Sequence, residues 1–126
     1  MGLARLYQGN GCYLVAWAAS APLGHVHLAF TEPPELQDLE VRPSHRRLGV
    51  ATALVAAAED EAQARGFHAI RLEVSTADVA AQALYHQCGY LDAGLPIRRV
   101  KGRIVLRTGP IDVDDSLLSL TKRLHG

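Results

Sequence analysis

Apolar and polar residues form two different patterns in the first quarter of the chain. Cys12–Ala19 is an almost continuous apolar run with aromatic residues, which is typical of a buried strand. In His25–Phe30 every second residue is large and apolar, which is typical of a strand with one buried face. The Ser-Ala-Pro-Leu-Gly segment between the runs predicts a turn, so we expect an antiparallel hairpin over residues 12–30. Residues 1–11 are expected to form only a short N-terminal stub.

The middle of the chain changes from the period of a strand to the period of a helix. Leu36–Val41 is expected to be a third strand, and the segment from Gly49 to Arg65 carries one apolar stripe at helical spacing. Gly66 stands where a helix often ends in a left-handed residue. Ala69–Val74 then alternates again. Strand, helix and strand in this order predict a crossover unit with two parallel strands.

The last third of the chain predicts one more helix and further strands. Asp78 is expected to cap a helix that runs to about Cys88 and stops before Gly89. The basic run Ile97–Arg107 alternates in part, and a last strand is expected over Ser116–Leu124. The resulting order is a strand-loop-helix over 36–66, a strand and second helix over 69–90, and C-terminal strands over 91–126. We therefore expect residues 1–126 to form a single mixed α/β domain.

The composition is that of an ordinary soluble globular domain, with 126 residues of which 48% are hydrophobic and 21% are charged. Because the formal net charge is zero, no overall field attracts nucleic acid or an anionic membrane, and a nucleic-acid-binding domain is disfavoured. No apolar run is long enough to cross a bilayer and no secretory leader is visible, so we expect a cytoplasmic protein with no membrane partner. Two cysteines are too few for a disulfide framework, and the histidines lack ligand spacing, so no metal is implied.

The start of the predicted helix at Gly49 combines three features of a phosphate site. The first turn of a helix carries backbone N–H groups without intrahelical acceptors. Gly49 has no side chain to block an anion, and Arg46 and Arg47 add positive charge beside the same groups. The segment fits neither a Walker loop nor the three-glycine dinucleotide motif. The alternative is a helix with a solvated basic N-terminus, but cations there oppose the helix dipole.

Two segments resemble the GCN5-related N-acetyltransferase (GNAT) superfamily. Arg46–Ala51 fits its Gln/Arg-x-x-Gly-x-Gly/Ala signature, and Asp78–Tyr90 is similar to its later Asn-x-x-Ala-x-x-Leu-Tyr-x-x-x-Gly-Phe segment. The resemblance covers residues 12–90 and the closing strand, and it indicates a small bacterial-type member with a reduced N-terminal segment. It implies the acyl-CoA N-acyltransferase fold, a mixed and mostly antiparallel sheet with a parallel, splayed central pair and helices on both faces.

The resemblance implies acetyl-CoA (coenzyme A) as co-substrate. The main chain of Val41 would pair with the pantetheine arm, and the N–H groups from Arg46 through Thr52 would hold the diphosphate. The implied coenzyme-binding residues are Val41, Arg46, Arg47, Leu48, Gly49, Val50, Ala51, Thr52, Asp78 and Tyr85.

For the chemistry, the resemblance assigns Tyr85 as the proton donor to the leaving thiolate, with a core aromatic as the alternative. Asp78 replaces the usual asparagine; a carboxylate only accepts hydrogen bonds, so we interpret it mainly as a helix cap. Glu40 and His27 are the preferred candidates for the base, against a merely solvated or cross-strand role for each. In strict alternation, Glu40 shares one side of its strand with Asp38.

The resulting hypothesis is an acetyl-CoA-dependent N-acetyltransferase that acts by direct attack in a ternary complex. The acceptor would be a primary amine of a small molecule, a protein N-terminus or a lysine. The alternative is a non-catalytic acyl-CoA-binding module for sensing or assembly. Compared with the family, the strand and two helices that usually precede the hairpin are expected to be absent or reduced. The acceptor site is therefore expected to be open or completed by a second subunit in a homodimer, with residues 96–115 as a candidate to cover it. The basic run Arg98–Arg107 is expected to pair with nearby aspartates, with recognition of an acidic substrate or a second subunit as the alternative.

Overall fold

The computed structural model describes residues 1–46 and 49–125. The chain divides into two compact units. Unit 1 contains Met1–Leu72 and the C-terminal residues from Thr121, and unit 2 contains Glu73–Leu120. Strands β5 (Ala69–Ser75) and β8 (Gly109–Arg123) pass through both units.

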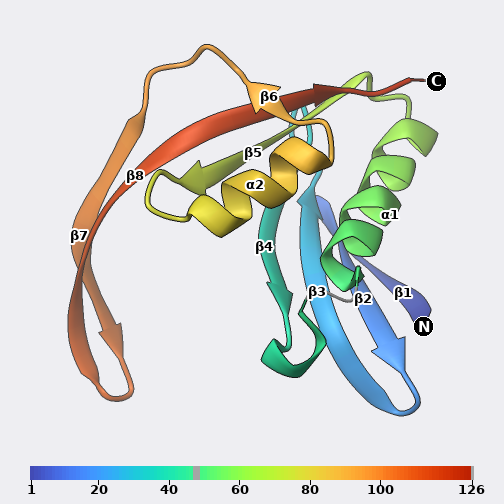
Figure 1. Cartoon of the computed structure of the whole chain (residues 1–126), viewed down its shortest axis with the longest axis horizontal. Coiled ribbons are helices and arrows are strands. Elements are labelled where there is room, and N and C mark those ends of the chain that lie inside the picture. Colours follow the sequence, from blue (N-terminus) through green and yellow to red (C-terminus); the bar gives the residue numbers. More distant parts are fainter. Residues whose placement is uncertain (47–48, 126) are drawn as a thin grey trace. The chain divides into compact units, whose positions relative to one another are not determined.

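Unit 1 is built on four antiparallel strands in chain order (Figure 1). These are β1 (Gly2–Gln8), β2 (Gly11–Ala18), β3 (Ala21–Ala29) and β4 (Glu35–Val41). The pairing of β2 with β3 confirms the expected hairpin. Its turn is shorter than predicted, because a register shift after Ala16 lets Pro22 join the strand opposite Trp17. Residues 1–11, expected to be a stub, supply strand β1, which pairs with β2 over its whole length.

Helix α1 (Val50–Ala64) covers one face of these strands and packs against β2, β3 and β4 (Figure 1). The apolar stripe predicted from the sequence is the buried side of this helix. Its alanines let the helix approach the sheet closely, and the expected left-handed end is present at Gly66, with φ +85°. The buried side chains of unit 1 include Leu14, Ala16, Val26, Leu28, Leu36, Leu54, Val55, Ala58, Ala62, Ile70 and Leu72.

Strand β4 contains a bulge that changes which side chains share a face. In its register with β3, Gln37 lies opposite His27, whereas Glu40 lies opposite His25. Two steps along β3 therefore match three steps along β4, and Asp38 takes up the extra residue with φ +54°. Strict alternation, which placed Glu40 with Asp38, is wrong here. Because directly paired residues share a face, Glu40 lies on the face of His25, His27 and Gln37.

The parallel pairing expected between β4 and β5 is present. It covers only Glu35 with Arg71 and Leu36 with Leu72, although β4 continues to Val41. After β4, the short 3-10 helix η1 (Pro43–His45) leads toward α1. The mixed sheet and the parallel β4–β5 pair agree with the expected acyltransferase fold.

Unit 2 contains α2 (Val79–Gln87), β6 (Leu91–Asp92) and β7 (Arg98–Leu106), and both strands pair with β8. The last strand was predicted to begin at Ser116, but β8 begins at Gly109. The reason is that residues 109–117 pair with β7 in an antiparallel ribbon. The expected pairing with nearby aspartates is confirmed for Arg99 with Asp114 and Arg103 with Asp112. Arg98 instead forms an ion pair with Glu73 of β5.

Within residues 1–46 and 49–125, no helix has the length and hydropathy of a membrane span. Neither Cys12 nor Cys88 forms a disulfide; Cys12 is buried and Cys88 is partly exposed.

Candidate active site

The start of α1 has the conformation that an anion site requires. Gly49 is the N-cap residue with φ +78°, and no side chain caps the helix. No acidic residue lies in the first turn, and a Cβ added at Gly49 would have no atom within 4 Å. No described residue therefore covers the backbone at this helix end, which carries the positive end of the helix dipole.

The segment before Gly49 brings two of the predicted coenzyme residues into contact. The guanidinium Nε of Arg46 donates to the carbonyl oxygen of Val41 at 3.3 Å. Arg46 is exposed, so its charge lies at the surface between β4 and α1. Val50, Ala51 and Thr52 form the first turn of α1. Arg47 and Leu48, the other two residues predicted for the diphosphate, lie outside the described residues.

Helix α2 of unit 2 carries the predicted proton donor. Tyr85 is buried, and its ring meets that of Tyr90 edge-on with centroids 5.9 Å apart. Burial raises the pKa of the Tyr85 phenol to about 12, and the nearby Asp78 carboxylate and Cys88 act in the same direction. Desolvation therefore keeps this hydroxyl protonated over a wider pH range than an exposed phenol.

Asp78 has the capping role predicted from the sequence. Its carboxylate accepts a hydrogen bond from the backbone N–H of Ala81 at 3.0 Å, and α2 begins at the next residue. This bond satisfies one of the free N–H groups of the helix start. Its predicted contact with the coenzyme stays a prediction.

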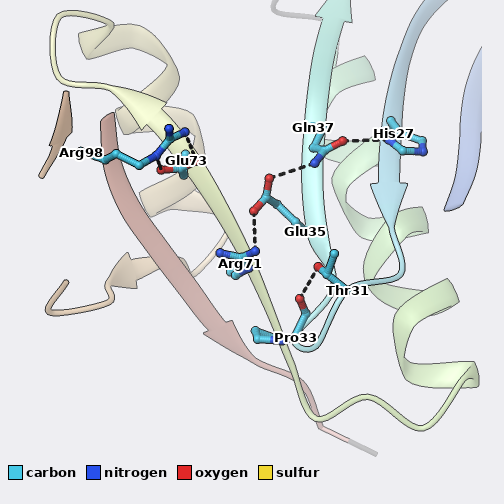
Figure 2. A network of polar contacts seen from close by, with 8 residues as sticks. All are labelled: His27, Thr31, Pro33, Glu35, Gln37, Arg71, Glu73 and Arg98. Carbon is cyan, nitrogen blue, oxygen red and sulfur yellow. Dashed lines mark hydrogen bonds and ion pairs between the residues drawn. The ribbon is translucent and has the colours of Figure 1, made fainter. Parts of the chain in front are cut away.

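On the face of unit 1 opposite α1, polar side chains form a continuous chain across three strands. Nδ1 of His27 lies 3.0 Å from Oε1 of Gln37. Nε2 of Gln37 donates to Oε1 of Glu35 at 3.0 Å, and Nη2 of Arg71 lies 3.0 Å from Oε2 of Glu35. Figure 2 shows Glu35 between Gln37 on its own strand and Arg71 on β5. We call these four side chains the His27 network.

The His27 network lies where the pairing between β4 and β5 ends. Glu35 and Arg71 form one of the two paired positions, and Gln37 is the next residue on this face before the bulge at Asp38. Both candidate bases are on this face: His27 within the network, and Glu40 beyond the bulge and exposed.

Sequence reasoning missed the other three members of the network. Alternation does place Glu35 and Gln37 on one side of the strand. Their link to His27 and Arg71 follows from the register of β4 with both of its neighbours, for which the chain carries no local signal. Within the described parts of the chain, no group of three or more His, Cys, Asp or Glu side chains could hold a metal ion.

The model of the Acetyltransferase (GNAT) family matches residues 3–90. The chain belongs to this family. Among curated proteins similar to this chain, human N-acetyltransferase 8 is 29% identical over 107 residues, which is 79% of this chain and 47% of the human protein. The chain spans less than half the length of the curated relatives it matches.

Solved structures of acetyltransferases share the fold. The ribosomal-protein-S18-alanine N-acetyltransferase of Escherichia coli superimposes with a TM-score of 0.74 at 22% identity, over 94% of this chain and 73% of that one. An acetyltransferase of Bacillus subtilis in complex with CoA gives a TM-score of 0.74 at 22% identity, over 92% of this chain and 78% of that one. At this identity the similarity establishes the fold alone.

Proposed function

We propose that this chain transfers an acetyl group from acetyl-CoA to a primary amine by direct attack in a ternary complex. The observation that carries the proposal is the open, uncapped start of α1 at Gly49, in a chain that belongs to the GNAT family. CoA in the Bacillus subtilis relative supports acetyl-CoA as the co-substrate.

In the proposed complex the diphosphate binds at the first turn of α1. The N–H groups of Val50, Ala51 and Thr52 point out of the helix start, as in any α-helix. Arg46 exchanges its contact with the Val41 carbonyl for a phosphate oxygen, which leaves the Val41 main chain for the pantetheine arm. The family resemblance adds Arg47 and Leu48 to this set, and it adds Asp78 and Tyr85 from α2.

The chemical step requires two proton transfers. The amine nitrogen attacks the thioester carbon, the C–N bond forms, and the C–S bond breaks. His27 takes the proton that the amine loses, and Tyr85 donates a proton to the departing thiolate. Glu40, exposed on the face of His27, attracts the ammonium form of the acceptor, which releases one proton to solvent before the neutral amine attacks.

Coenzyme binding is tested by thermal unfolding with and without acetyl-CoA. A ligand of the native state stabilises it by about 2.7 kcal/mol at about 100 times its Kd, so Tm is expected to rise. Gly49→Ala should abolish the rise, because a side chain then occupies the open space at the helix start. An unchanged Tm at millimolar acetyl-CoA would contradict the proposal.

Gly66→Ala is the matched control for this variant. Gly66 has φ +85° and Gly49 has φ +78°, and neither has an atom within 4 Å of an added Cβ. Both substitutions place alanine in the left-handed region at a similar cost of about 1–2 kcal/mol. Only Gly49→Ala is expected to lose the response to acetyl-CoA; equal responses would contradict the assignment of Gly49.

Acetyl transfer is tested by release of free thiol from acetyl-CoA in the presence of amines. Two structural relatives are named as acting on a ribosomal-protein alanine and on an aminoglycoside, so the panel should contain N-terminal peptides, lysine peptides and small polyamines. Amine-dependent thiol release supports the proposal. A Tm rise without release for any amine would favour the non-catalytic acyl-CoA-binding module instead.

A further inference from the structure

The hydrogen bonds of the His27 network have only one consistent direction. A carboxylate accepts hydrogen bonds and does not donate them. The Gln37 atom that lies 3.0 Å from Oε1 of Glu35 is therefore its amide nitrogen. The amide oxygen then faces Nδ1 of His27 at 3.0 Å, and an amide oxygen only accepts. It follows that Nδ1 of His27 carries a proton.

Arg71 holds the Glu35 carboxylate in the orientation in which it accepts a hydrogen bond from Gln37. The guanidinium lies 3.0 Å from Oε2 of Glu35, while Oε1 accepts from Gln37. Both carboxylate oxygens are engaged, so Glu35 acts as a fixed acceptor rather than as a free base. The amide of Gln37 cannot turn over without placing its oxygen against a carboxylate.

The shape of the sheet also holds the imidazole of His27 in place. The ring lies against that of Tyr13 on β2, with centroids 4.4 Å apart. A side chain at Gly11 would collide with the His27 ring at Nε2, so the ring occupies the space above that glycine. These contacts and the bond to Gln37 leave the ring one orientation.

We propose that Gln37, Glu35 and Arg71 are positioning residues that keep the Nδ1 proton on His27 and make Nε2 the nitrogen that takes up the proton of the acceptor amine. The inference rests on the proposed acetyl transfer and identifies how its base is prepared. Because Nε2 lies against Gly11 of β2 rather than toward β4, the amine proton passes to Nε2 through water as the C–N bond forms and the C–S bond breaks. The resulting imidazolium later releases that proton to solvent.

The other titratable and charged groups that surround this ring come from all the neighbouring strands. They are Tyr13, His25, Glu35, Glu40 and Arg71. Among the described side chains, only Gln37 is within hydrogen-bond distance of Nδ1, so Gln37 decides which ring nitrogen is protonated.

The proposal is tested by nitrogen-15 NMR of the intact protein with labelled histidine, at a pH where the ring is neutral. The His27 signals are assigned by their loss in His27→Gln. We expect a protonated Nδ1 and an unprotonated Nε2 in the wild type. A wild-type ring protonated on Nε2 alone would overturn the proposal, whatever the activity of the protein.

Two variants test whether the network sets this state. Gln37→Leu removes the acceptor, and Glu35→Gln lets the amide of Gln37 turn over. Each should populate the form of His27 protonated on Nε2. Gln82→Leu is the control, because Gln82 donates to the backbone of Ser75 and Thr76 in unit 2, and it should leave the His27 spectrum unchanged. An unchanged spectrum in both network variants would contradict the positioning role.

Kinetics separate this inference from the proposed function. His27→Gln is expected to lower kcat about 100-fold and Gln37→Leu about tenfold, in the range of general-base effects, with the Kd of acetyl-CoA unchanged. A proton on Nδ1 without amine-dependent thiol release would refute the acetyl transfer but not the proton position. Full activity in Gln37→Leu would refute the positioning role alone.

Discussion

Tyr85 is the residue whose environment most directly suits a catalytic proton donor. It is buried on α2, and burial raises the pKa of its phenol to about 12. A phenol of that pKa stays protonated at neutral pH and can donate a hydrogen bond to the departing sulfur. Because an ordinary thiol has a pKa of about 8.5, the phenol passes its proton on only while the sulfur is being released and is itself reprotonated from solvent. We expect Tyr85→Phe to lower kcat about 100-fold while the Kd of acetyl-CoA stays close to that of the wild type.

Tyr90, whose ring contacts that of Tyr85, provides the control variant. Tyr90→Phe removes a hydroxyl from the adjacent ring and should leave kcat near the wild-type value. Ultraviolet titration of Tyr85→Phe should lack the tyrosinate step near pH 12. Equal losses of kcat and of coenzyme affinity in Tyr85→Phe would refute its role as proton donor.

Single residues differ in how well the sequence predicted their roles. Asp78 and Gly66 were predicted correctly, because a helix cap depends only on a few neighbouring residues. The contact of Glu35 with Arg71 could not be predicted, because it depends on strand pairing between segments separated by helix α1. The contact of Gln37 with His27 likewise depends on the register of β4 with β3. The high pKa of Tyr85 depends on burial, which local pattern alone does not fix.

At the scale of elements, the bulge in β4 determines which of its side chains share the face of His27. Asp38 is one of two non-glycine residues with positive φ in the described chain, at +54°. Asp38→Gly is expected to preserve or raise the free energy of unfolding, and Asp38→Val to lower it by about 1–3 kcal/mol. If Asp38→Val removes the bulge, Glu40 leaves the face of His27, and acetyl-CoA affinity should fall as well.

Glu40→Val is the control for this prediction, because it places the same residue two positions along the same strand. Glu40 does not have a positive φ, and a β-branched residue fits an extended strand. Denaturant midpoints compare the three variants. If Asp38→Val and Glu40→Val had the same free energy of unfolding, the positive φ of Asp38 would cost no stability, and the prediction would be wrong.

The elements that sequence predicted best were those with a clear period and clear ends. Both helices and β5 lie within a residue or two of their predicted bounds. The start of β8 was missed because residues 109–115 contain proline and three aspartates, which disfavour strands. They are extended because they pair with β7, where Arg103 lies opposite Asp112. Tertiary pairing here overrides local preference.

At the scale of the whole molecule, a net charge of zero requires that a polyanionic coenzyme be attracted by local charge. Arg46→Ala and Arg107→Ala change the net charge equally, and both side chains are exposed. Arg46 lies beside the start of α1, whereas Arg107 belongs to the turn between β7 and β8. If the overall field governed binding, both variants would weaken acetyl-CoA binding to the same extent.

We expect only Arg46→Ala to weaken acetyl-CoA binding, by about tenfold at low salt, which corresponds to about 1.4 kcal/mol. The wild-type affinity should fall as ionic strength rises, because an exposed charge is screened over about 10 Å at 0.1 M salt. Arg46→Ala should show a smaller salt dependence, and Arg107→Ala the wild-type dependence. Titration calorimetry at two salt concentrations distinguishes these outcomes. An equal salt dependence of acetyl-CoA affinity in all three proteins would show that Arg46 does not contact the coenzyme. It would contradict diphosphate binding at the start of α1.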